Sequence, residues 1–457
     1  MAISNIQRGV VQTGVRLASV KVDRKREQQA ANGKNVVLVE GARTPFLMAG
    51  TDYKNMWSHD LLRFAYQGLV SKSGIDPNEI DYVVAGNVLQ EVKTSNVARE
   101  AALGAGLPLD IAAHTVTMAC ISSNQAISSV AAKIALGEID VGIGSGVEIM
   151  SDVPIRVSRP LRRLLLESQK AKKPADFLAL LKRFRPGMLA PELPAIAEFS
   201  TNEVMGHSAD RLAAAFNISR KDQDEFALRS HTKAKEATEA GKLSDIVPVY
   251  IPGVKDAITK DNGIRITPPE KLASLNAAFV KPHGTVTAGN ASFLSDGASA
   301  TLLMSEDKAL ELGLEPLAYL RSSVYVAQDP KDELLLGPAY STPKVLAKEG
   351  LTLDDISVFE VHEAFAGQVL ANLAALDSDE FCRSKLGLDG KVGAVDMDKL
   401  NLWGGSLSIA HPFGATGSRL HYHAAKRLRE GADSKYALIT ACAAGGLGTA
   451  SIVERYE

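Results

Sequence analysis

The sequence predicts an α/β fold in which two similar domains, each layered α/β/α around a mixed but mainly parallel sheet, place a shared site at their junction. Short apolar runs typical of buried strands alternate with amphipathic helical patterns in both halves of the chain. Residues 350–360 also repeat the turn-and-strand layout of residues 74–85, each after a comparable helix. Repetition at so long a period indicates a duplicated domain rather than a solenoid.

Composition sets the broad class of protein. The chain has 457 residues, 46% of them hydrophobic and 23% charged, as expected of a globular protein with two or three domains. Its formal net charge of -2 predicts no nucleic-acid partner. The 3 cysteines are too few for a disulfide framework and favour a reducing compartment. No apolar run reaches the length of about 18 residues that predicts a transmembrane helix.

Residues 1–34 are expected to form a targeting leader and a charged linker. Up to residue 22 the chain contains Arg8, Arg16 and Lys21 among apolar residues, and no Asp or Glu. An amphipathic, acid-free start of this kind is typical of organelle-targeting leaders. A merely disordered N-terminus is the alternative interpretation.

The first domain is predicted to comprise residues 35–154 and 285–315. Strands and helices alternate along it. The expected elements are strands at 35–40, 82–86 and 141–146, helices at 59–73 and 96–104, a loop at 41–46 and a turn at 74–80. At 297–304 the pattern fits a helix or a strand, and the choice stays open.

Cys120 stands where the apolar run Val116–Asn124 opens a strongly patterned helix that ends near Gly137. The N-terminus of a helix lowers a cysteine pKa from about 8.5 toward roughly 3.5–7.5. The position therefore suits a thiolate nucleophile. Because free cysteines are often small buried hydrophobes, a chemical role requires a partner elsewhere in the chain.

Residues 155–284 are expected to form an inserted, mostly helical loop domain. Between residues 156 and 187, ten Lys or Arg residues stand against two acidic ones, interleaved with Leu and Phe. A basic amphipathic segment of this kind suits an anionic membrane surface. A helical insertion that packs on another subunit fits the pattern equally well. The candidate membrane-binding residues are Lys170, Lys172, Lys173, Lys182, Arg183 and Arg185.

The second domain, residues 316–457, carries three stretches that could supply partners for Cys120. Val361–Phe365 ends a strand and opens a helix, Asn401–Gly417 sets a histidine among glycines, and Thr440–Gly448 sets a second cysteine at a strand end. Each stretch alone is weak evidence. Together they offer a base, a second thiol and backbone donors for a cysteine nucleophile.

In this combination the chain resembles the thiolase family from about residue 35 to its end. The Cys120 loop, the His-Glu-Ala-Phe stretch, the Gly-Gly and His-Pro-Phe-Gly loop and the Cys and Gly-Gly loop all occur in the family's order. The resemblance implies an acetyl-CoA C-acyltransferase with no metal or bound cofactor, in which CoA is a substrate. It implies Cys120 as the nucleophile, His411 as its base and Cys442 as a second acid and base.

The resemblance also implies which groups stabilise developing charge. Backbone N–H groups of Cys120 and Ala444 would form one oxyanion hole, and His411 with a water held by His362 would form another. The residues implied along the pantetheine channel of CoA are Met205, Ala288, Ser292 and Phe365. The chain departs from the family pattern where His362 replaces Asn and where Ala410 and Ala444 replace Gly. A positive φ at either alanine would strain the backbone.

The basic insertion, His362 and residues 205–211 resemble the mitochondrial long-chain members of the family. That resemblance implies thiolytic cleavage of 3-ketoacyl-CoA in fatty acid β-oxidation, on the matrix side of the inner mitochondrial membrane. It further implies a homodimer and an alpha subunit with enoyl-CoA hydratase and 3-hydroxyacyl-CoA dehydrogenase activities. The alternatives are an acetoacetyl-CoA thiolase, a ketoacyl synthase-like condensing enzyme, and an inactive thiolase-like scaffold for a membrane complex.

Overall fold

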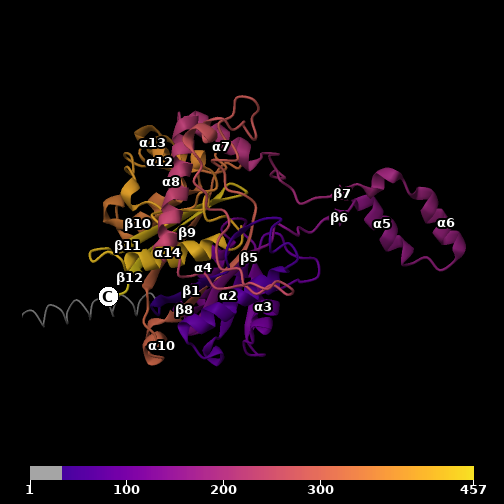
Figure 1. Cartoon of the computed structure of the whole chain (residues 1–457), viewed down its shortest axis with the longest axis horizontal. Coiled ribbons are helices and arrows are strands. Elements are labelled where there is room, and N and C mark those ends of the chain that lie inside the picture. The colour runs from indigo at the N-terminus through magenta and orange to yellow at the C-terminus, as the bar shows by residue number, and fades with distance from the viewer. Residues whose placement is uncertain (1–32) are drawn as a thin grey trace, which may run out of the picture.

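One ten-stranded sheet runs through both halves of the chain in a computed structural model that describes residues 33–457 (Figure 1). The strand order is β10-β11-β12-β9-β1-β8-β5-β3-β4, and β2 lies beside β8. These strands are β1 (Val36–Arg43), β2 (Leu47–Met48), β3 (Tyr82–Gly86), β4 (Ala112–Val116), β5 (Val141–Glu148), β8 (Ser295–Ser305), β9 (Ala318–Ala327), β10 (Ile356–Val361), β11 (Tyr436–Ala443) and β12 (Leu447–Arg455). Most of the leader and linker predicted for residues 1–34 lies outside the described residues.

The sheet is mixed, as predicted, but the expectation that it is mainly parallel is wrong. Only β3 with β4, β3 with β5, and β10 with β11 run parallel among the strand pairs of the described sheet. The other pairs are antiparallel. The connections explain the difference, because β12 turns straight back from β11 and β8 returns between β5 and β1. Hydrophobic patterning marks a buried strand but does not give its direction.

Helices cover both faces of the sheet. They are α2 (Ser58–Ser73), α3 (Val97–Ala105), α4 (Ser122–Ala135), α10 (Glu306–Glu311), α11 (Gly337–Glu349), α12 (Ala366–Leu376), α13 (Asp379–Leu386) and α14 (Thr416–Leu428). α2 and α3 share a core with the first half of the sheet, and α11 and α12 share one with the second half. α4 and α14 contact each other and strands of the sheet.

Alternate residues of the strands enter different hydrophobic cores, which gives the molecule its layers. In β1, Val37 faces the core under α2 and Leu38 faces a core shared by the two halves. In β11, Leu438 faces the core under α11 and Ile439 faces the shared core. Since α4 and α14 fill the shared core, each half has helices on both faces, as the α/β/α prediction requires.

The internal repetition seen in the sequence is confirmed in the structure. α2 ends at Gly74 with φ 69°, and α11 ends at Gly350 with φ 66°. A short 3-10 turn and then a strand follow in both copies, β3 in the first and β10 in the second. Glycine adopts this left-handed conformation without steric cost, so both helices end with the same C-terminal motif.

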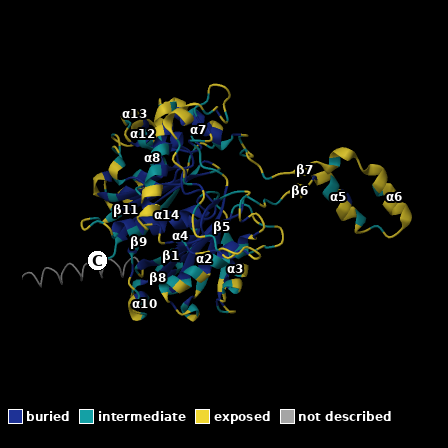
Figure 2. Cartoon of the chain, viewed as in Figure 1, coloured by how far each residue is buried: buried dark blue, intermediate teal, exposed yellow. Residues whose placement is uncertain are grey.

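The residues between β5 and β8 form two different parts. A hairpin bounded by β6 (Arg156–Val157) and β7 (Pro191–Glu192) carries α5 (Arg159–Ser168) and α6 (Pro174–Arg183) and projects away from the body (Figure 1). Its surface is mostly exposed (Figure 2). The other part contains α7 (Met205–Ala215), α8 (Arg220–Glu239) and α9 (Pro269–Ala273). α7 and α8 contact α12, so this part packs on the second half of the chain although it interrupts the first.

Two local expectations are settled by tertiary contacts. Residues 297–304, which fitted a helix or a strand, lie in β8, and this strand is buried along its whole length between β1 and β5. The strand expected at 35–40 continues to Arg43, so residues 41–43 are not a loop. The buried Arg43 guanidinium binds Asp245 at 2.9 Å and Asp261 at 2.6 Å, which ties the insertion to β1.

Candidate active site

Cys120 lies in a tight turn between β4 and the start of α4, as the sequence predicts. The preceding residue, Ala119, has φ 46°, a left-handed conformation that is uncommon for a residue with a Cβ. The Ser122 hydroxyl fixes this turn by accepting from the Met118 N–H at 2.8 Å and donating to the Ala119 carbonyl at 2.6 Å. The turn holds Cys120 half-buried against β11.

The expectation of a lowered pKa for Cys120 is wrong. Burial raises the pKa of the Cys120 thiol to about 12; the N–H groups of Ala444 and of Cys120 itself oppose the rise, and the carboxylates of Glu148 and Glu198 add to it. Removal of the thiol from water outweighs the favourable N–H groups. At neutral pH the resting side chain is therefore a thiol, and its attack on a carbonyl requires a base.

The second predicted thiol lies close to the first. Cys442 is buried in β11, and its pKa is raised by burial and by the nearby Cys120. The third cysteine, Cys382, is buried in α13, where its sulfur lies 3.5 Å from the Ala375 carbonyl oxygen. The structure thus brings two of the three cysteines together and leaves Cys382 available as a matched control.

The two predicted histidines form a buried pair. His362 follows β10 and His411 lies in the loop before α14, and their ring centroids are 4.1 Å apart. The Nδ1 atom of His362 is 3.0 Å from Ser406 Oγ, and that of His411 is 2.7 Å from Thr416 Oγ1. Both Nε2 atoms are buried without a hydrogen-bond partner among residues 33–457. A buried polar atom without a partner is expected where a ligand or a water binds.

Both histidines are neutral at physiological pH. Burial lowers the pKa of His362 to about 3, with a further contribution from the Arg419 guanidinium. Burial also lowers the pKa of His411 well below its ordinary value, and His362 and Arg419 add to this effect. A neutral imidazole can accept a proton during a reaction, so either ring could serve as a base.

The backbone conformation differs between the two alanines that stand where the family has Gly. Ala410 has φ 117°, so the strain that a positive φ would cause at this position is present. Ala444 is not among the described residues with positive φ, and the turn between β11 and β12 instead places Gly445 at φ 85° and Gly446 at φ 68°. The Ala444 N–H reaches Cys120, which is the arrangement expected of an oxyanion donor.

Glu148, a buried carboxylate at the end of β5, was not predicted from the sequence. Its oxygens accept from the N–H groups of Val88 at 3.1 Å, Leu89 at 2.9 Å and Gly414 at 3.0 Å. The residue therefore ties the loop after β3 to the loop that carries His411. Burial raises its pKa to about 7. A buried strand predicted to continue past residue 146 could have drawn attention to an acidic residue at its end.

Glu363 was also missed, although it lies inside the motif that contains His362. Its buried carboxylate accepts from Ser230 at 2.7 Å, from Asn401 at 2.7 Å and from the Leu407 N–H at 3.2 Å. These partners come from α8 and from the loop that leads to His411. Burial raises its pKa above the ordinary value. Glu363 fastens both histidine loops to the inserted α8.

Of the residues predicted to bind CoA, Met205, Ser292 and Phe365 contact parts of this site, and Ala288 has no described contact with the thiols or the histidines. Phe365 is buried and shares a core with Cys442, and the half-buried Met205 packs on that core. The Ser292 N–H donates to the Ala364 carbonyl at 2.9 Å, which places its loop beside the His362 strand end. Ala288 is exposed, and its carbonyl is 3.5 Å from the Arg265 guanidinium.

The candidate membrane-binding residues all lie on the projecting hairpin, far along the chain from the thiols. Arg183 forms an ion pair with Glu167, and Arg185 donates to the carbonyls of Lys182 and Phe184 at 2.8 and 2.9 Å. Beside these cations several large apolar side chains are exposed: Leu165, Leu166, Phe177, Leu178, Leu181 and Phe184. The hairpin thus combines positive charge with exposed apolar surface.

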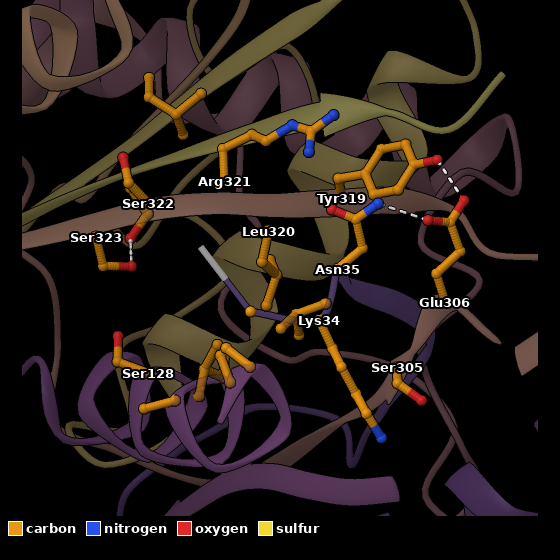
Figure 3. Close-up of a pocket in the computed structure, with 18 of the residues that line it drawn as sticks. Lys34, Asn35, Ser128, Ser305, Glu306, Tyr319, Leu320, Arg321, Ser322 and Ser323 are labelled. Atoms are coloured by element: carbon orange, nitrogen blue, oxygen red, sulfur yellow. Dashed lines mark hydrogen bonds between the residues drawn. The ribbon is translucent and has the colours of Figure 1, made fainter. Parts of the chain in front are cut away.

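A large cavity of about 1450 Å³ lies elsewhere, between α4 and β9 (Figure 3). Lys34, Arg321 and Ser128 line it, and Cys120, His362, His411 and Cys442 do not. The candidate chemistry therefore lies outside this cavity. Within the described part of the chain no cluster of His, Cys, Asp or Glu residues is arranged to hold a metal ion. No helix there is long and apolar enough to cross a membrane.

The parallel strands explain why the reactive residues converge. Gly86 and Val116 end β3 and β4 level with each other, Gly86 pairs with Gly146 near the end of β5, and Cys120 follows four residues after Val116. In the other half, Val361 pairs with Thr440, so His362 leaves β10 beside the last residues of β11. Carboxyl ends of parallel strands are the usual place for a site in an α/β protein.

Comparison with known proteins agrees with this arrangement. The model of the thiolase N-terminal domain matches residues 36–307, and that of the thiolase C-terminal domain matches residues 314–455. The chain is 59% identical over 438 residues to the mitochondrial trifunctional enzyme subunit beta of Mus musculus, covering 96% of this chain and 92% of that one. It is 57% identical to a probable 3-ketoacyl-CoA thiolase of Caenorhabditis elegans, covering 93% of this chain and 95% of that one.

The crystal structure of the Bacillus anthracis acetyl-CoA acetyltransferase has the same fold. It superposes with a TM-score of 0.78 at 33% sequence identity, covering 93% of this chain and 100% of that chain. The domain models together span nearly all of the residues that the structure describes. The chain therefore belongs to the thiolase family.

Proposed function

We propose that this protein is a 3-ketoacyl-CoA thiolase of fatty acid β-oxidation, which uses CoA to split long-chain 3-ketoacyl-CoA into acetyl-CoA and a shorter acyl-CoA. The observation that carries the proposal is the meeting of two neighbouring thiols, Cys120 and Cys442, with a pair of buried histidines. The names of the relatives, a trifunctional enzyme subunit beta and a 3-ketoacyl-CoA thiolase, support the substrate class.

In the first half of the reaction Cys120 Sγ attacks the 3-keto carbon of the substrate. Since the resting side chain is a thiol, its proton passes to His411 Nε2, which has no other partner in the described site. The bond between C2 and C3 then breaks. The electron pair remains on C2 as the enolate of acetyl-CoA, and the Cys442 thiol donates the proton that converts it to acetyl-CoA.

In the second half CoA takes the acyl group. The CoA thiol gives its proton to the Cys442 thiolate, and its sulfur attacks the thioester carbon on Cys120. Expulsion of the Cys120 thiolate releases the acyl-CoA, and the proton held by His411 returns to Cys120. Each thiol and each histidine nitrogen is thereby restored to its starting state.

The N–H groups of Cys120 and Ala444 both approach the Cys120 sulfur. They would stabilise negative charge that develops on the oxygen of the acyl group attached to Cys120. Removal of one such donor usually costs about 100- to 1000-fold in rate. At the thioester oxygen of acetyl-CoA, where the enolate forms, His411 would act with a water held by His362. Met205, Ala288, Ser292 and Phe365 would border the pantetheine arm, which is supported for Met205 and Phe365 by their packing on the core that holds Cys442 and for Ser292 by its bond to Ala364.

The proposal extends to assembly and location. By analogy with the subunit-beta relatives, the chain would form a homodimer and associate with an alpha subunit that carries the preceding hydratase and dehydrogenase steps. The relatives are mitochondrial, which supports a mitochondrial location. The basic and apolar surface of the α5–α6 hairpin supports contact with the matrix face of the inner membrane.

The test is CoA-dependent cleavage of 3-ketohexadecanoyl-CoA beside acetoacetyl-CoA. We expect cleavage of the long substrate by the wild type and losses of at least about 1000-fold in Cys120→Ala and Cys442→Ala, since nucleophile and acid are both required. Cys382→Ala is the matched control, because that thiol is buried in α13 and donates to the Ala375 and Leu376 carbonyls rather than to a residue proposed to act in the reaction.

The possible outcomes of this test distinguish the candidate functions from one another. Cleavage of acetoacetyl-CoA alone would retain the mechanism and reject the long-chain assignment. Condensation without any need for Cys442 would favour a ketoacyl synthase-like enzyme. An inactive wild type, even when an alpha subunit is present, would favour a scaffold.

A further inference from the structure

The hydrogen bonds behind the two histidines differ in direction. Behind His411, Thr416 Oγ1 lies 2.7 Å from Nδ1 and 3.0 Å from the Pro412 carbonyl oxygen. A carbonyl oxygen can only accept, so the Thr416 hydroxyl donates its single proton to Pro412. The short contact with His411 is then satisfied only if Nδ1 carries the proton. In the neutral ring, His411 Nε2 is consequently an acceptor.

Behind His362 the direction is reversed. Ser406 Oγ accepts from the Arg419 guanidinium at 3.0 Å and lies 3.0 Å from His362 Nδ1. Within residues 33–457 the only acceptor in hydrogen-bond contact with the Ser406 hydroxyl is that Nδ1 atom. All of these atoms are buried, and an unused donor there is costly. The hydroxyl therefore donates to Nδ1, and the proton of the neutral His362 ring lies on Nε2.

We propose that Thr416 and the Ser406–Arg419 pair are positioning residues that hold the two histidines in opposite tautomers, His411 as an acceptor and His362 as a donor at Nε2. The two Nε2 atoms are buried and have no partner in the described structure, and their rings lie 4.1 Å apart between centroids. A site with one acceptor and one donor can take the Cys120 proton at the first and bind an oxygen at the second.

This arrangement explains how a histidine at position 362 can replace the asparagine of the family pattern. An asparagine presents a donor through its amide NH₂, whereas a histidine presents one at Nε2 only in one of its two tautomers. Ser406 and Arg419 select that tautomer. The role assigned to His362 rests on the proposed function, but the tautomer of each ring and the reactivity of Cys120 do not.

The test separates the two histidines by two readouts. The first is alkylation of Cys120 by iodoacetamide, followed by mass spectrometry, which reports proton removal without any substrate. The second is turnover of 3-ketohexadecanoyl-CoA. Thr416→Val keeps the shape of the side chain but removes the hydroxyl, so we expect alkylation to slow by about tenfold or more. Thr416→Ser retains the hydroxyl and should restore the wild-type rate.

Ser406→Ala should change turnover but not the alkylation of Cys120. Alkylation of Cys120 is expected to stay within about twofold of wild type, whereas turnover falls by about 100-fold, the usual cost of one lost oxyanion donor. Ser408→Ala is the matched control in the same loop, since its hydroxyl bonds Ser230 and Gly405 and neither histidine. Thermal unfolding of every variant shows whether it is folded.

One further measurement observes the two tautomers directly. Nitrogen-15 NMR of histidine-labelled wild type should assign the proton to Nδ1 in His411 and to Nε2 in His362, with the Thr416 and Ser406 variants identifying the signals. The same tautomer in both rings would overturn the inference, as would wild-type alkylation in Thr416→Val or wild-type turnover in Ser406→Ala. If the wild type does not cleave the substrate, the proposed function fails while the alkylation and NMR results still judge the tautomers.

Discussion

At the scale of single residues, burial decides the protonation states in the site. The helix N-terminus and two N–H groups favour a thiolate at Cys120, but the loss of water around the sulfur is larger. The same loss keeps His362 and His411 neutral. A thiol beside a neutral imidazole is stable until substrate arrives, and the proton then moves in the step that needs it. This protects a nucleophile that would otherwise be exposed to oxidation.

Glu148 yields a pH prediction at the same scale. Its pKa rises from 4.5 to about 7 on folding, so between these values the folded chain binds a proton that the unfolded chain has lost. The contribution of Glu148 to the free energy of unfolding is therefore complete below pH 4.5 and is lost as the pH rises through 7, by up to roughly 3 kcal/mol. Glu148→Gln cannot ionise, so its thermal unfolding midpoint should fall less between pH 5 and pH 8 than that of the wild type.

Circular dichroism at the two pH values measures both midpoints. Glu311→Gln, a change at an exposed carboxylate on α10, is the control and should keep the wild-type pH dependence. An equal fall in the midpoint of Glu148→Gln and of the wild type would contradict the assigned pKa.

At the scale of elements, the local hydrophobic pattern of the sequence correctly predicted where helices and strands occur. The helix at 59–73 and the strand at 82–86 agree with α2 and β3 to within one residue, because each has an uninterrupted apolar period and a clear boundary. The direction of each strand and its pairing partners could not be predicted from the local pattern, since they depend on contacts between strands that are distant in the sequence. The strand nature of residues 297–304 likewise comes from pairing with β1 and β5.

In the candidate site, too, some residues could be predicted from local sequence and others depend on tertiary contacts. The thiols and histidines could be named because their motifs carry the family resemblance. Glu148 could have been noticed only as an acidic residue at the end of a buried strand. Ser406 and Thr416 could not be named, because nothing in the local sequence distinguishes a buried Ser or Thr that orients a histidine from one that merely fills space. Their roles follow from hydrogen bonds between elements far apart in the chain.

The α5–α6 hairpin carries the element-scale prediction. Its exposed Leu178 and Leu181, 57% and 73% accessible, lie near Lys170, Lys172 and Lys173, so apolar insertion and charge attraction would act together. Replacing the three lysines with Gln should weaken binding to phosphatidylserine-containing liposomes by roughly 100-fold at low salt, at about 1 kcal/mol for each cation. Co-sedimentation of the protein with liposomes measures the change.

A matched variant tests whether the location of the charge matters. Lys221, Lys235 and Lys255 are exposed on the body rather than on the hairpin, and their replacement by Gln removes the same net charge. That variant should bind liposomes like the wild type. Equal binding by the hairpin variant and the wild type would exclude the membrane role and leave contact with another subunit as the function of the hairpin.

At the scale of the whole molecule, the duplicated fold makes one site from two halves. The first half supplies Cys120 and Glu148, the second supplies Cys442 and both histidines, and the packing of α4 against α14 fixes one half relative to the other. The Ser418 N–H donates to Ser123 Oγ at 3.1 Å across this contact. Neither half holds a complete set of reactive groups, so the chemistry depends on their junction.

Assembly beyond the single chain is expected to use the edge of the sheet. β4 is the last strand at one end. The Val116 carbonyl accepts from the Asn87 N–H on the β3 side at 3.1 Å. Because backbone groups of alternate residues point to opposite sides of a strand, Ala113 directs its N–H away from β3. The Ala113 carbonyl on that side accepts from the Asn96 side chain at 3.0 Å, and an edge strand with an outward N–H is a template for pairing with a second copy.

Ala113→Pro therefore tests the homodimer. Proline removes the outward N–H but is tolerated on an edge strand, so the monomer should fold while the dimer dissociates at least about tenfold more readily. Light scattering coupled to gel filtration should give twice the chain mass of 48.6 kDa for the wild type. Ala113→Val keeps the N–H and should remain dimeric. A folded Ala113→Pro protein that dimerises as tightly as wild type would place the interface on another face of the molecule.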